Sequence, residues 1–257
     1  MKVIILAGGL GTRLSEETDL KPKPMVLIDD KPILWHLMNS FAIQGMNEFV
    51  IALGYRGDVI KRWLYDLNVL EGNFTIDTQN RKIEHLEVGT ARDWKVTALE
   101  TGLESLTGRR ISQCLKAFPN QRVIATYGDG LANISIKKLI EFHEDHGKLA
   151  TVTAVRPPAR FGHLEINGSQ VMNFAEKNKN DSTWINGGYF VLEPEVIEFL
   201  SDSNEAFETG ALPRLVEKQQ LMAYRHHDFW QPMDTLREKN ELSVLAKENP
   251  PPWLRYQ

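Results

Sequence analysis

Apolar and polar positions alternate with two different periods along the first 155 residues. Short apolar runs predict buried strands at residues 2–6, 48–53, 121–127 and 149–155. Between these runs, apolar residues recur at helical spacing and predict helices over residues 31–45, 58–67 and 135–146. Strands that alternate with helices favour βαβ units. The pattern therefore predicts an α/β fold, with a Rossmann-like, mostly parallel open sheet and helices on both of its faces.

The pattern changes after residue 155, where short strands and turns become more frequent. Residues 164–174 predict a β-hairpin with a two-residue turn at Asn167 and Gly168. Residues 72–110 have weak periodicity, so we expect an irregular or hairpin excursion there, with residues 101–110 exposed. Further along, the pattern predicts one strand and three helices, at residues 188–192, 194–200, 212–218 and 235–247. The sheet is therefore expected to carry small β-hairpin excursions.

A glycine-rich loop directly follows the first predicted strand, in the sequence Leu6-Ala-Gly-Gly-Leu-Gly-Thr-Arg-Leu14. Three closely spaced glycines leave successive backbone N–H groups uncovered, and such groups form a concave anion site. Arg13 adds a planar set of donors suited to phosphate oxygens, and Lys21 and Lys23 lie beside prolines that stiffen the backbone. The loop lacks the last glycine of G-x-G-x-x-G and the Gly-Lys-Ser/Thr of a P-loop. It is therefore either a phosphate-binding loop of another kind or an ordinary glycine-rich turn.

Two aspartates are candidate metal ligands because of where they lie relative to the predicted elements. Asp129 stands between two glycines, just after the strand at residues 121–127, and open α/β sheets collect ligands at such strand ends. Mg²⁺ prefers oxygen and usually takes one or two carboxylates together with substrate phosphates. Asp129 and Asp234 can each instead cap the helix that follows, and the residues alone leave both alternatives open. His143 and His146 have no apparent third ligand, so they are expected on a helix surface.

Composition narrows the classes of partner. The formal net charge of −4 offers no electrostatic basis for binding nucleic acid. Cys114 is the only cysteine, which excludes an intrachain disulfide and suits a reducing compartment. No apolar run approaches the ~20 residues of a membrane helix, and the N-terminus lacks the ~7–15 apolar residues of a signal peptide. We therefore expect a cytoplasmic protein with no nucleic-acid or membrane partner.

Motifs spread over nearly the whole chain resemble those of the sugar-phosphate nucleotidylyltransferases, also called nucleotide-sugar pyrophosphorylases. The glycine loop matches the Gly-Gly-x-Gly-Thr-Arg-Leu signature of that family. Within the family, the chain is more similar to the glucose-1-phosphate cytidylyltransferase (CDP-glucose pyrophosphorylase) branch. The resemblance is carried by Leu14-Ser-Glu-Glu-Thr18, Lys21-Pro-Lys-Pro-Met25, Lys31-Pro-Ile-Leu-Trp-His36, Thr126-Tyr-Gly-Asp-Gly130, Ile185-Asn-Gly-Gly188 and Phe229-Trp-Gln-Pro-Met-Asp-Thr-Leu236.

This resemblance implies a reaction and an organisation of the chain. The reaction is Mg²⁺-dependent nucleotidylyl transfer from CTP to α-D-glucose 1-phosphate, which gives CDP-glucose and pyrophosphate. The partners are thus CTP and glucose 1-phosphate, and the family suggests a homo-oligomer (a trimer or hexamer) that serves surface-polysaccharide synthesis. Residues 1–257 would form a single nucleotidylyltransferase domain. Its nucleotide-binding part would span about 1–155, and its sugar-phosphate-binding part about 156–257.

The resemblance also assigns roles to individual residues. It implies that Arg13, Lys23 and Lys177 are catalytic and that Asp129 and Asp234 bind the metal. The nucleotide-binding residues that it implies are Leu6, Ala7, Gly8, Gly9, Gly11, Thr12, Arg13, Lys23, Thr107, Arg110 and Gly128. The sugar-phosphate-binding residues that it implies are Glu176, Lys177, Asn186 and Gly187.

Three positions depart from the pattern of the family. Glu100 replaces an aspartate, Arg109 replaces a glycine and Asn178 replaces a proline. The β-carbon of Arg109 disfavours a positive φ at that position, and its side chain adds a cation to residues 101–110. The same chemistry with UTP, dTTP or another phosphorylated acceptor therefore stays open. A non-catalytic relative that binds nucleotide sugars is a further alternative.

Overall fold

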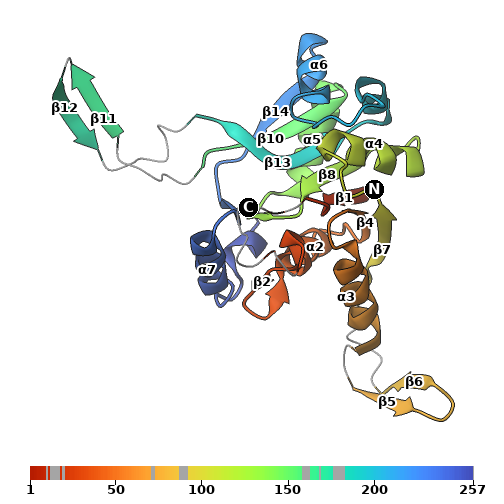
Figure 1. Cartoon of the computed structure of the whole chain (residues 1–257). Helices are drawn as coiled ribbons and strands as arrows, with labels where there is room; N and C mark the ends of the chain where they lie inside the picture. Colours follow the sequence, from red (N-terminus) through yellow and green to blue (C-terminus); the bar gives the residue numbers. More distant parts are fainter. Residues whose placement is uncertain are drawn as a thin grey trace.

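A seven-stranded sheet runs through the centre of the described part of the chain, in the order β14-β10-β13-β8-β1-β4-β7 (Figure 1). The computed structural model describes residues 1–9, 11, 18, 21–70, 73–86, 92–157, 163–167, 169–175 and 183–256. The strands of the sheet are β1 (Lys2–Leu6), β4 (Glu48–Leu53), β7 (Lys95–Glu100), β8 (Val123–Tyr127), β10 (Ala150–Val155), β13 (Ile185–Leu192) and β14 (Leu221–Arg225). Among them, β13 is antiparallel to β8 and β10, and the other pairs are parallel. The predicted mostly parallel α/β sheet is confirmed.

Helices cover both faces of this sheet (Figure 1). Side chains alternate along β1, so Val3 and Ile5 face one layer and Ile4 faces the other. The layer beside Val3 and Ile5 contains α2 (Ile33–Ala42), α3 (Gly57–Leu70), α5 (Ile136–His146), α7 (Leu236–Leu245) and the 3-10 helix η5 (Pro252–Leu254). The layer beside Ile4 contains α4 (Thr107–Ala117), the 3-10 helix η4 (Pro194–Phe199) and α6 (Ala211–Glu217). The central strands are buried on both faces, which explains their continuous apolar runs in the sequence.

Two small antiparallel pairs connect the sheet to its helices. β2 (Leu27–Ile28) pairs with β3 (Lys31–Pro32), directly before α2 begins. β9 (Gly130–Ala132) pairs with β15 (Trp230–Pro232), although the two strands are far apart in the sequence. The second pairing brings the end of β8 next to the start of α7.

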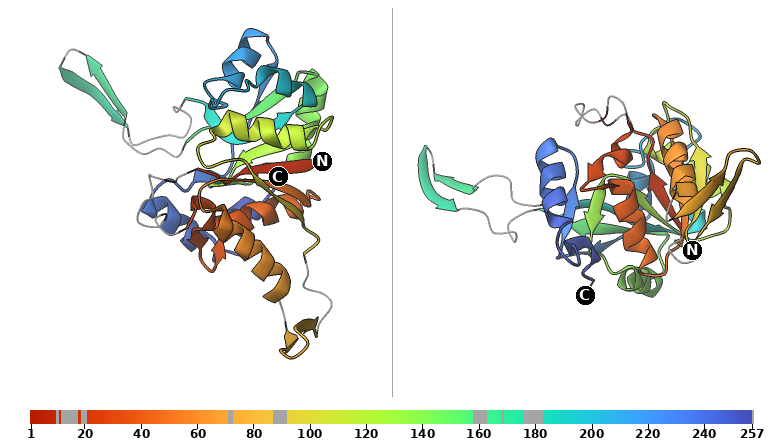
Figure 2. Two further views of the ribbon diagram at one scale, coloured as in Figure 1. Left: turned by 45° about the vertical axis from the view of Figure 1, so that its right-hand side comes forward. Right: turned by 90° about the horizontal axis from the view of Figure 1, so that it is seen from below.

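Two of the described hairpins stand away from the body of the molecule (Figures 1 and 2). They are formed by β5 (Phe74–Asp77) with β6 (Lys82–His85) and by β11 (His163–Asn167) with β12 (Gln170–Ala175). Small hairpin excursions were predicted in both regions. Asn167 pairs with Gln170, so it belongs to the strand and not to the turn that the sequence predicted.

The prediction that residues 101–110 are exposed holds for only part of this segment: residues 102–104, 106 and 109 are exposed, but Thr101 and Arg110 are buried. β7 forms the edge of the sheet just before them, and α4 begins at Thr107. The side chain of Thr101 is 1% exposed and that of Arg110 is 3% exposed. Thr101 Oγ1 donates to the carbonyl oxygen of Leu53, and Arg110 donates to the same oxygen. These polar side chains are buried because main-chain acceptors from a distant strand satisfy them, and a local sequence pattern does not show such acceptors.

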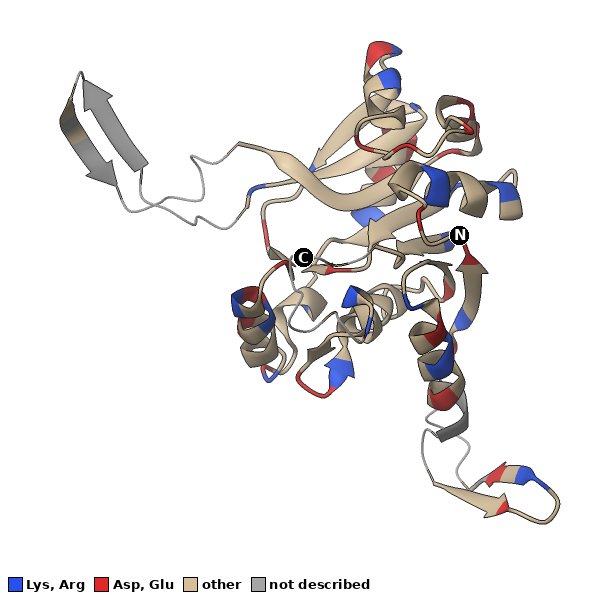
Figure 3. Ribbon diagram, in the orientation of Figure 1, with Lys and Arg blue, Asp and Glu red and all other residues tan. Residues whose placement is uncertain are grey.

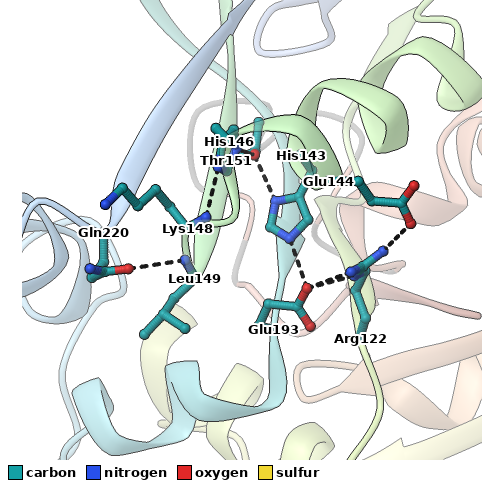
Figure 4. Close-up of polar contacts among 9 residues, drawn as sticks. All are labelled: Arg122, His143, Glu144, His146, Lys148, Leu149, Thr151, Glu193 and Gln220. Atoms are coloured by element: carbon teal, nitrogen blue, oxygen red, sulfur yellow. Dashed lines mark hydrogen bonds and ion pairs between the residues drawn. The ribbon is translucent and has the colours of Figure 1, made fainter.

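His143 is also buried, although the sequence predicted that it lies on a helix surface. It belongs to α5 and is 1% exposed. Its Nδ1 lies 2.8 Å from Thr151 Oγ1 in β10, and its Nε2 lies 3.2 Å from Glu193 Oε1 (Figure 4). Glu193 also accepts from Arg122 Nε at 2.7 Å. This cluster of His143, Thr151, Glu193 and Arg122 fastens α5 to the sheet.

Positively and negatively charged residues are mixed along the described parts of α3 and α7 (Figure 3). Neither helix presents the continuous basic stripe that is typical of a nucleic-acid-binding surface. In the described part of the chain, no helix is both long enough and apolar enough to cross a membrane.

Candidate active site

A cleft of about 910 Å³ opens at the carboxyl ends of β1 and β8. Open α/β sheets collect their ligands at this end of the strands. The cleft is lined by the described residues that were predicted to bind nucleotide, sugar phosphate or metal: Leu6, Ala7, Gly8, Gly9, Gly11, Lys23, Thr107, Arg110, Gly128, Asp129, Asn186, Gly187 and Asp234. Four further predicted site residues lie outside the described residues: Thr12, Arg13, Glu176 and Lys177. The fold thus gathers the predicted site residues that it describes into one cavity.

The glycine loop is anchored to the neighbouring strand by main-chain hydrogen bonds. Ala7 N donates to the carbonyl oxygen of Ala52 at 3.0 Å, and Tyr55 N donates to that of Gly8 at 3.1 Å. Gly11 has a φ of +66°, in the left-handed region that glycine tolerates best. A Cβ on Gly9 would meet no described atom within 4 Å, and Gly9 lines the cleft. The described part of the loop therefore presents uncovered backbone to the cavity at Gly9, as an anion site requires.

Arg110 lies beneath the glycine loop and donates to main-chain carbonyl oxygens. Nη1 donates to Leu53 at 2.8 Å and to Gly102 at 2.9 Å, and Nη2 donates to Gly8 at 2.9 Å. These carbonyls lie at the carboxyl end of β4 and just past the carboxyl ends of β7 and β1, three strands that are adjacent in the sheet. A Cβ on Gly8 would lie 2.2 Å from Arg110 Nη1, so glycine is required for this close approach. Arg110 supports the loop in this structure, and its contact with a nucleotide stays a prediction.

Lys23 joins the two predicted metal ligands. It begins the 3-10 helix η2 (Lys23–Met25), and its Nζ lies 2.6 Å from Asp129 Oδ2 and 2.7 Å from Asp234 Oδ1. The pairing of β9 with β15 brings the aspartates together, and Met233 N donates to the carbonyl oxygen of Asp129 at 2.8 Å. Burial by itself would lower the pKa of Lys23, but the carboxylates of Asp129 and Asp234 outweigh burial and raise it. One ammonium faces two carboxylates, so the cluster keeps a net negative charge.

Helix capping does not account for either aspartate. The N-cap of α7 is Thr235, whose side chain accepts from Glu238 N at 3.2 Å. The Glu238 carboxylate accepts in return from the backbone N–H groups of Thr235 and Asp234, at 2.9 and 2.8 Å. This capping box satisfies the helix N-terminus without the Asp234 carboxylate. Likewise, Ser135 caps α5, so Asp129 is not the cap that the sequence left possible.

The donor set of this cluster suits a hard divalent cation. Asp129 and Asp234 both line the cleft, and their oxygens already converge on a cation, the Lys23 ammonium. Mg²⁺ usually binds one or two carboxylates and completes its shell with waters and substrate phosphates. Among the described residues, no three His, Cys, Asp or Glu side chains form a metal-binding group. Two carboxylates in the cleft that the described glycines of the loop also line therefore suit a divalent metal of this kind.

The predicted sugar-contacting turn lies at the start of β13 and is tightly held. Asn186 Oδ1 accepts from Gly188 N at 2.8 Å, and Asn186 Nδ2 donates to the Tyr127 hydroxyl at 3.2 Å. Gly188 has a φ of +80°, and a Cβ there would lie 2.5 Å from the Tyr127 ring. Trp230 Nε1 donates to the carbonyl oxygen of Gly187 at 2.8 Å. These bonds orient the Asn186 amide and use one of its two N–H groups.

Sequence reasoning missed two residues near the cleft. Tyr127 lines it and ends β8, so its position directly before Gly128 and Asp129 was a usable signal. Glu208 contacts Tyr127 from outside the cleft, through a hydrogen bond that the Tyr127 hydroxyl donates. Glu208 lies between η4 and α6 in a segment without a recognisable motif, so only the packing of the chain reveals it.

Comparison with known proteins identifies the class of protein. Residues 2–237 match the family model described as nucleotidyl transferase, so this chain belongs to the nucleotidyl transferase family and is an enzyme of that family. It is 45% identical over 260 residues to glucose-1-phosphate cytidylyltransferase of Salmonella typhimurium, and the alignment covers 100% of both chains. It is 39% identical over 254 residues to the probable glucose-1-phosphate cytidylyltransferase of Bacillus subtilis, covering 98% of this chain and 99% of that one. The resemblance that the motifs predicted is thereby confirmed.

Solved structures share the fold. HddC from Yersinia pseudotuberculosis, crystallised with GMP-PN, superposes with a TM-score of 0.69 at 25% identity, covering 96% of this chain and 99% of that one. A UDP-glucose pyrophosphorylase complexed with UDP-glucose superposes with a TM-score of 0.68 at 17% identity, covering 95% and 97%. At such low identity, the second likeness shows the fold alone.

Proposed function

We propose that this enzyme transfers the cytidylyl group of CTP to α-D-glucose 1-phosphate, giving CDP-glucose and pyrophosphate. The observation that carries the proposal is the cluster of Lys23, Asp129 and Asp234 in the same cleft as the glycine loop and the Asn186 turn. In this one cleft, the glycine loop suits a triphosphate, the Asn186 turn suits a sugar, and Lys23 offers a positive charge to the reacting phosphate. Full-length relatives named for this reaction support the choice of CTP and glucose 1-phosphate.

In the proposed reaction, an oxygen of the sugar phosphate attacks the α-phosphorus of CTP in line with the leaving pyrophosphate. One P–O bond forms while the bond to pyrophosphate breaks, so the protein supplies mainly positioning and charge neutralisation. Lys23 would donate to oxygens of the α-phosphate. The backbone N–H groups of the glycine loop, together with Arg13, would hold the two leaving phosphates. Glu176, Lys177 and Asn186 would hold the incoming sugar phosphate.

Mg²⁺ is the cofactor that we propose. Asp129 and Asp234 would hold it, and the bound ion would supply charge neutralisation to the phosphates. In this structure the same two carboxylates hold Lys23 Nζ, the donor that we propose for the phosphate oxygens. The protein itself thus contributes the Lys23 ammonium, which lies beside the proposed reaction centre and which Asp129 and Asp234 help to keep protonated.

The decisive experiment is a pyrophosphate-release assay on the purified enzyme. CTP, UTP, dTTP and GTP are each tested with glucose 1-phosphate and with mannose 1-phosphate, in the presence of Mg²⁺. We expect the highest turnover with CTP and glucose 1-phosphate, and an Asp129→Asn preparation controls for contaminating enzymes. Comparable turnover with UTP would contradict the assignment of CTP and leave the broader family chemistry. The absence of turnover with every pair would contradict catalysis and favour a nucleotide-sugar-binding role.

We also propose that the enzyme acts as a homo-oligomer, a trimer or a hexamer. The β11–β12 hairpin reaches beyond the body of the chain (Figure 2), and Met172 on it is 59% exposed. An exposed apolar side chain on a projecting hairpin suits packing against another copy. Size-exclusion chromatography with light scattering measures the mass directly, and a monomer over a wide range of concentration would contradict this proposal.

A further inference from the structure

Glu208 contacts one residue on each of two walls of the cleft. Its Oε2 accepts from Thr107 Oγ1 at 2.6 Å, and its Oε1 accepts from the Tyr127 hydroxyl. Thr107 and Tyr127 both line the cleft, whereas Glu208 belongs to the segment between η4 and α6. One carboxylate therefore joins α4 to the end of β8.

The two walls have different proposed ligands. Thr107 begins α4, and Arg110, one turn later in this helix, supports the glycine loop of the nucleotide side. The Tyr127 hydroxyl accepts from Asn186 Nδ2 at 3.2 Å, in the turn of the sugar side. Glu208 thus lies at the centre of a hydrogen-bond chain that runs from the nucleotide side to the sugar side.

The donors set the direction of each hydrogen bond in this chain. The Tyr127 hydroxyl accepts an N–H from Asn186, so its single hydrogen points to Glu208. Thr107 Oγ1 accepts from Phe207 N at 2.8 Å, so its hydrogen also points to Glu208. Both bonds need an acceptor oxygen, and an ionised carboxylate offers two of them. A glutamine at this position would turn an N–H group toward one of the two hydroxyl hydrogens.

Charge and burial agree with this direction. Burial, and after it the nearby Glu208 carboxylate, raises the pKa of the Tyr127 hydroxyl. The hydrogen-bond chain through Glu208 therefore has one stable arrangement of hydrogens while the Glu208 carboxylate is ionised.

We infer that Glu208 is a positioning residue that couples nucleotide binding to sugar-phosphate binding, an inference that rests on the proposed function. A nucleotide that fixes the start of α4 also fixes Thr107, and through Glu208 it fixes Tyr127 and the Asn186 amide. Side chains that the first substrate has ordered then do not have to be ordered again when the second substrate binds. Because such coupling is reciprocal, each substrate raises the affinity for the other by the same factor.

The test measures this factor by calorimetry. The dissociation constant of the unreactive analogue α,β-methylene-CTP, with Mg²⁺, is determined in the absence and in the presence of saturating glucose 1-phosphate. We expect glucose 1-phosphate to tighten binding about fivefold or more in the wild-type enzyme, at the lower end of usual coupling factors. In Glu208→Gln the factor should fall to about one. Tyr127→Phe removes the hydroxyl, and with it the hydrogen bond to Glu208 and the one from Asn186 Nδ2, without a change of charge, and it should abolish the coupling equally.

The matched control is Glu205→Gln, a change of the same kind in the same segment. The Glu205 carboxylate pairs with Arg214 and accepts from Ser201 N. Loss of its charge therefore loosens the segment but leaves the hydrogen bonds of Glu208 in place. Glu205→Gln should keep the wild-type coupling factor. Thermal unfolding confirms that each variant is folded, and Tyr127→Phe still tests the inference when Glu208→Gln does not fold.

Three results would overturn the inference. These are a wild-type coupling factor of one, an unchanged factor in Glu208→Gln or in Tyr127→Phe, and an equal loss in Glu205→Gln. A failure of the proposed function is distinct, because it appears as turnover with another nucleotide or another sugar phosphate. The coupling is then measured with the unreactive analogue of the productive pair, and the same three results decide the role of Glu208.

Discussion

Lys23 Nζ lies 2.6 Å from Asp129 Oδ2, although 106 positions separate the two residues in the sequence. Asp234 Oδ1 lies 2.7 Å from the same nitrogen, on a segment that reaches the site through the pairing of β9 with β15. The Lys23 ammonium is thus held by two carboxylates, in the cleft that the described glycines of the loop also line. Charge is thereby concentrated at one point of a protein whose overall charge is modest.

Activity is expected to need both carboxylates. Asp129→Asn and Asp234→Asn should each lose most of their turnover, because the amide keeps the shape of the side chain but removes its charge. The unfolding free energy should fall by only about 1–2 kcal/mol, since the remaining carboxylate still pairs with Lys23. Turnover at saturating Mg²⁺ and urea unfolding measure the two effects. Asp202→Asn, at an exposed carboxylate that pairs with Lys116, should keep wild-type turnover. Near-normal turnover in either site variant would rule out a two-carboxylate site.

Gly8 should not tolerate a side chain. A Cβ at Gly8 would lie 2.2 Å from Nη1 and 2.3 Å from Cζ of Arg110, so Gly8→Ala must displace the guanidinium. We expect a loss of about 1–3 kcal/mol in unfolding free energy, the usual cost of overpacking. Gly9→Ala is the control, because a Cβ there meets no described atom within 4 Å, and it should cost less than about 1 kcal/mol. Equal urea midpoints for the two variants would contradict the close approach of Arg110 to the loop.

Arg110 is expected to stabilise the fold and not only to serve a ligand. Arg110→Ala leaves the carbonyls of Gly8, Leu53 and Gly102 without these donors, so unfolding free energy should fall by about 3 kcal/mol or more. Arg109→Ala, its exposed neighbour on α4, should change it by less than about 0.5 kcal/mol. Urea unfolding without ligand measures both. A variant of Arg110 that loses affinity for CTP at unchanged stability would show that the residue acts mainly on the nucleotide.

The stability of the fold should fall as the pH drops below neutral, with His143 contributing. His146 Nδ1 accepts from Lys148 N at 2.9 Å, so its Nε2–H donates to Thr151 Oγ1, and Thr151 donates to His143 Nδ1 (Figure 4). His143 is thus held neutral. Burial lowers its pKa and outweighs Glu193, which raises it; Arg122 and His146 also lower it. A lowered folded pKa means that the unfolded state gains a proton first, so this stability is complete above pH ~6.5 and is lost below it.

The measurement is urea unfolding at pH 7.5 and at pH 5.5. His143→Gln should have a lower free energy of unfolding than the wild type at pH 7.5. Its free energy of unfolding should fall less on acidification, because it lacks one titrating group. His36, His146 and His226 also have lowered pKa values from burial, so part of the pH dependence should remain. His227→Gln, at an exposed position, should behave like the wild type. An unchanged pH dependence in His143→Gln would contradict this role.

The sequence by itself determined the central strands and the edge of the sheet at which the candidate site lies. β1 at Lys2–Leu6 and β4 at Glu48–Leu53 have the predicted bounds, because strands that are buried on both faces must be continuous apolar runs. The glycines after β1 and the acid after β8 were also visible, since in a parallel sheet both must reach the same edge. These features depend on neighbours in the chain, so a local pattern is sufficient to predict them.

Only the tertiary structure showed which polar side chains are buried and which groups they contact. Arg110 and His143 are charged or titratable types that are typical of a surface, yet carbonyls from β4 and a carboxylate next to β13 satisfy them in the core. The structure also showed that Thr235 caps α7 and that Asp234 pairs with Lys23. Glu208 has no motif at all, and its two hydrogen bonds exist because distant segments meet. The burial of a polar group depends on partners from elsewhere in the chain, and only the folded chain supplies those partners.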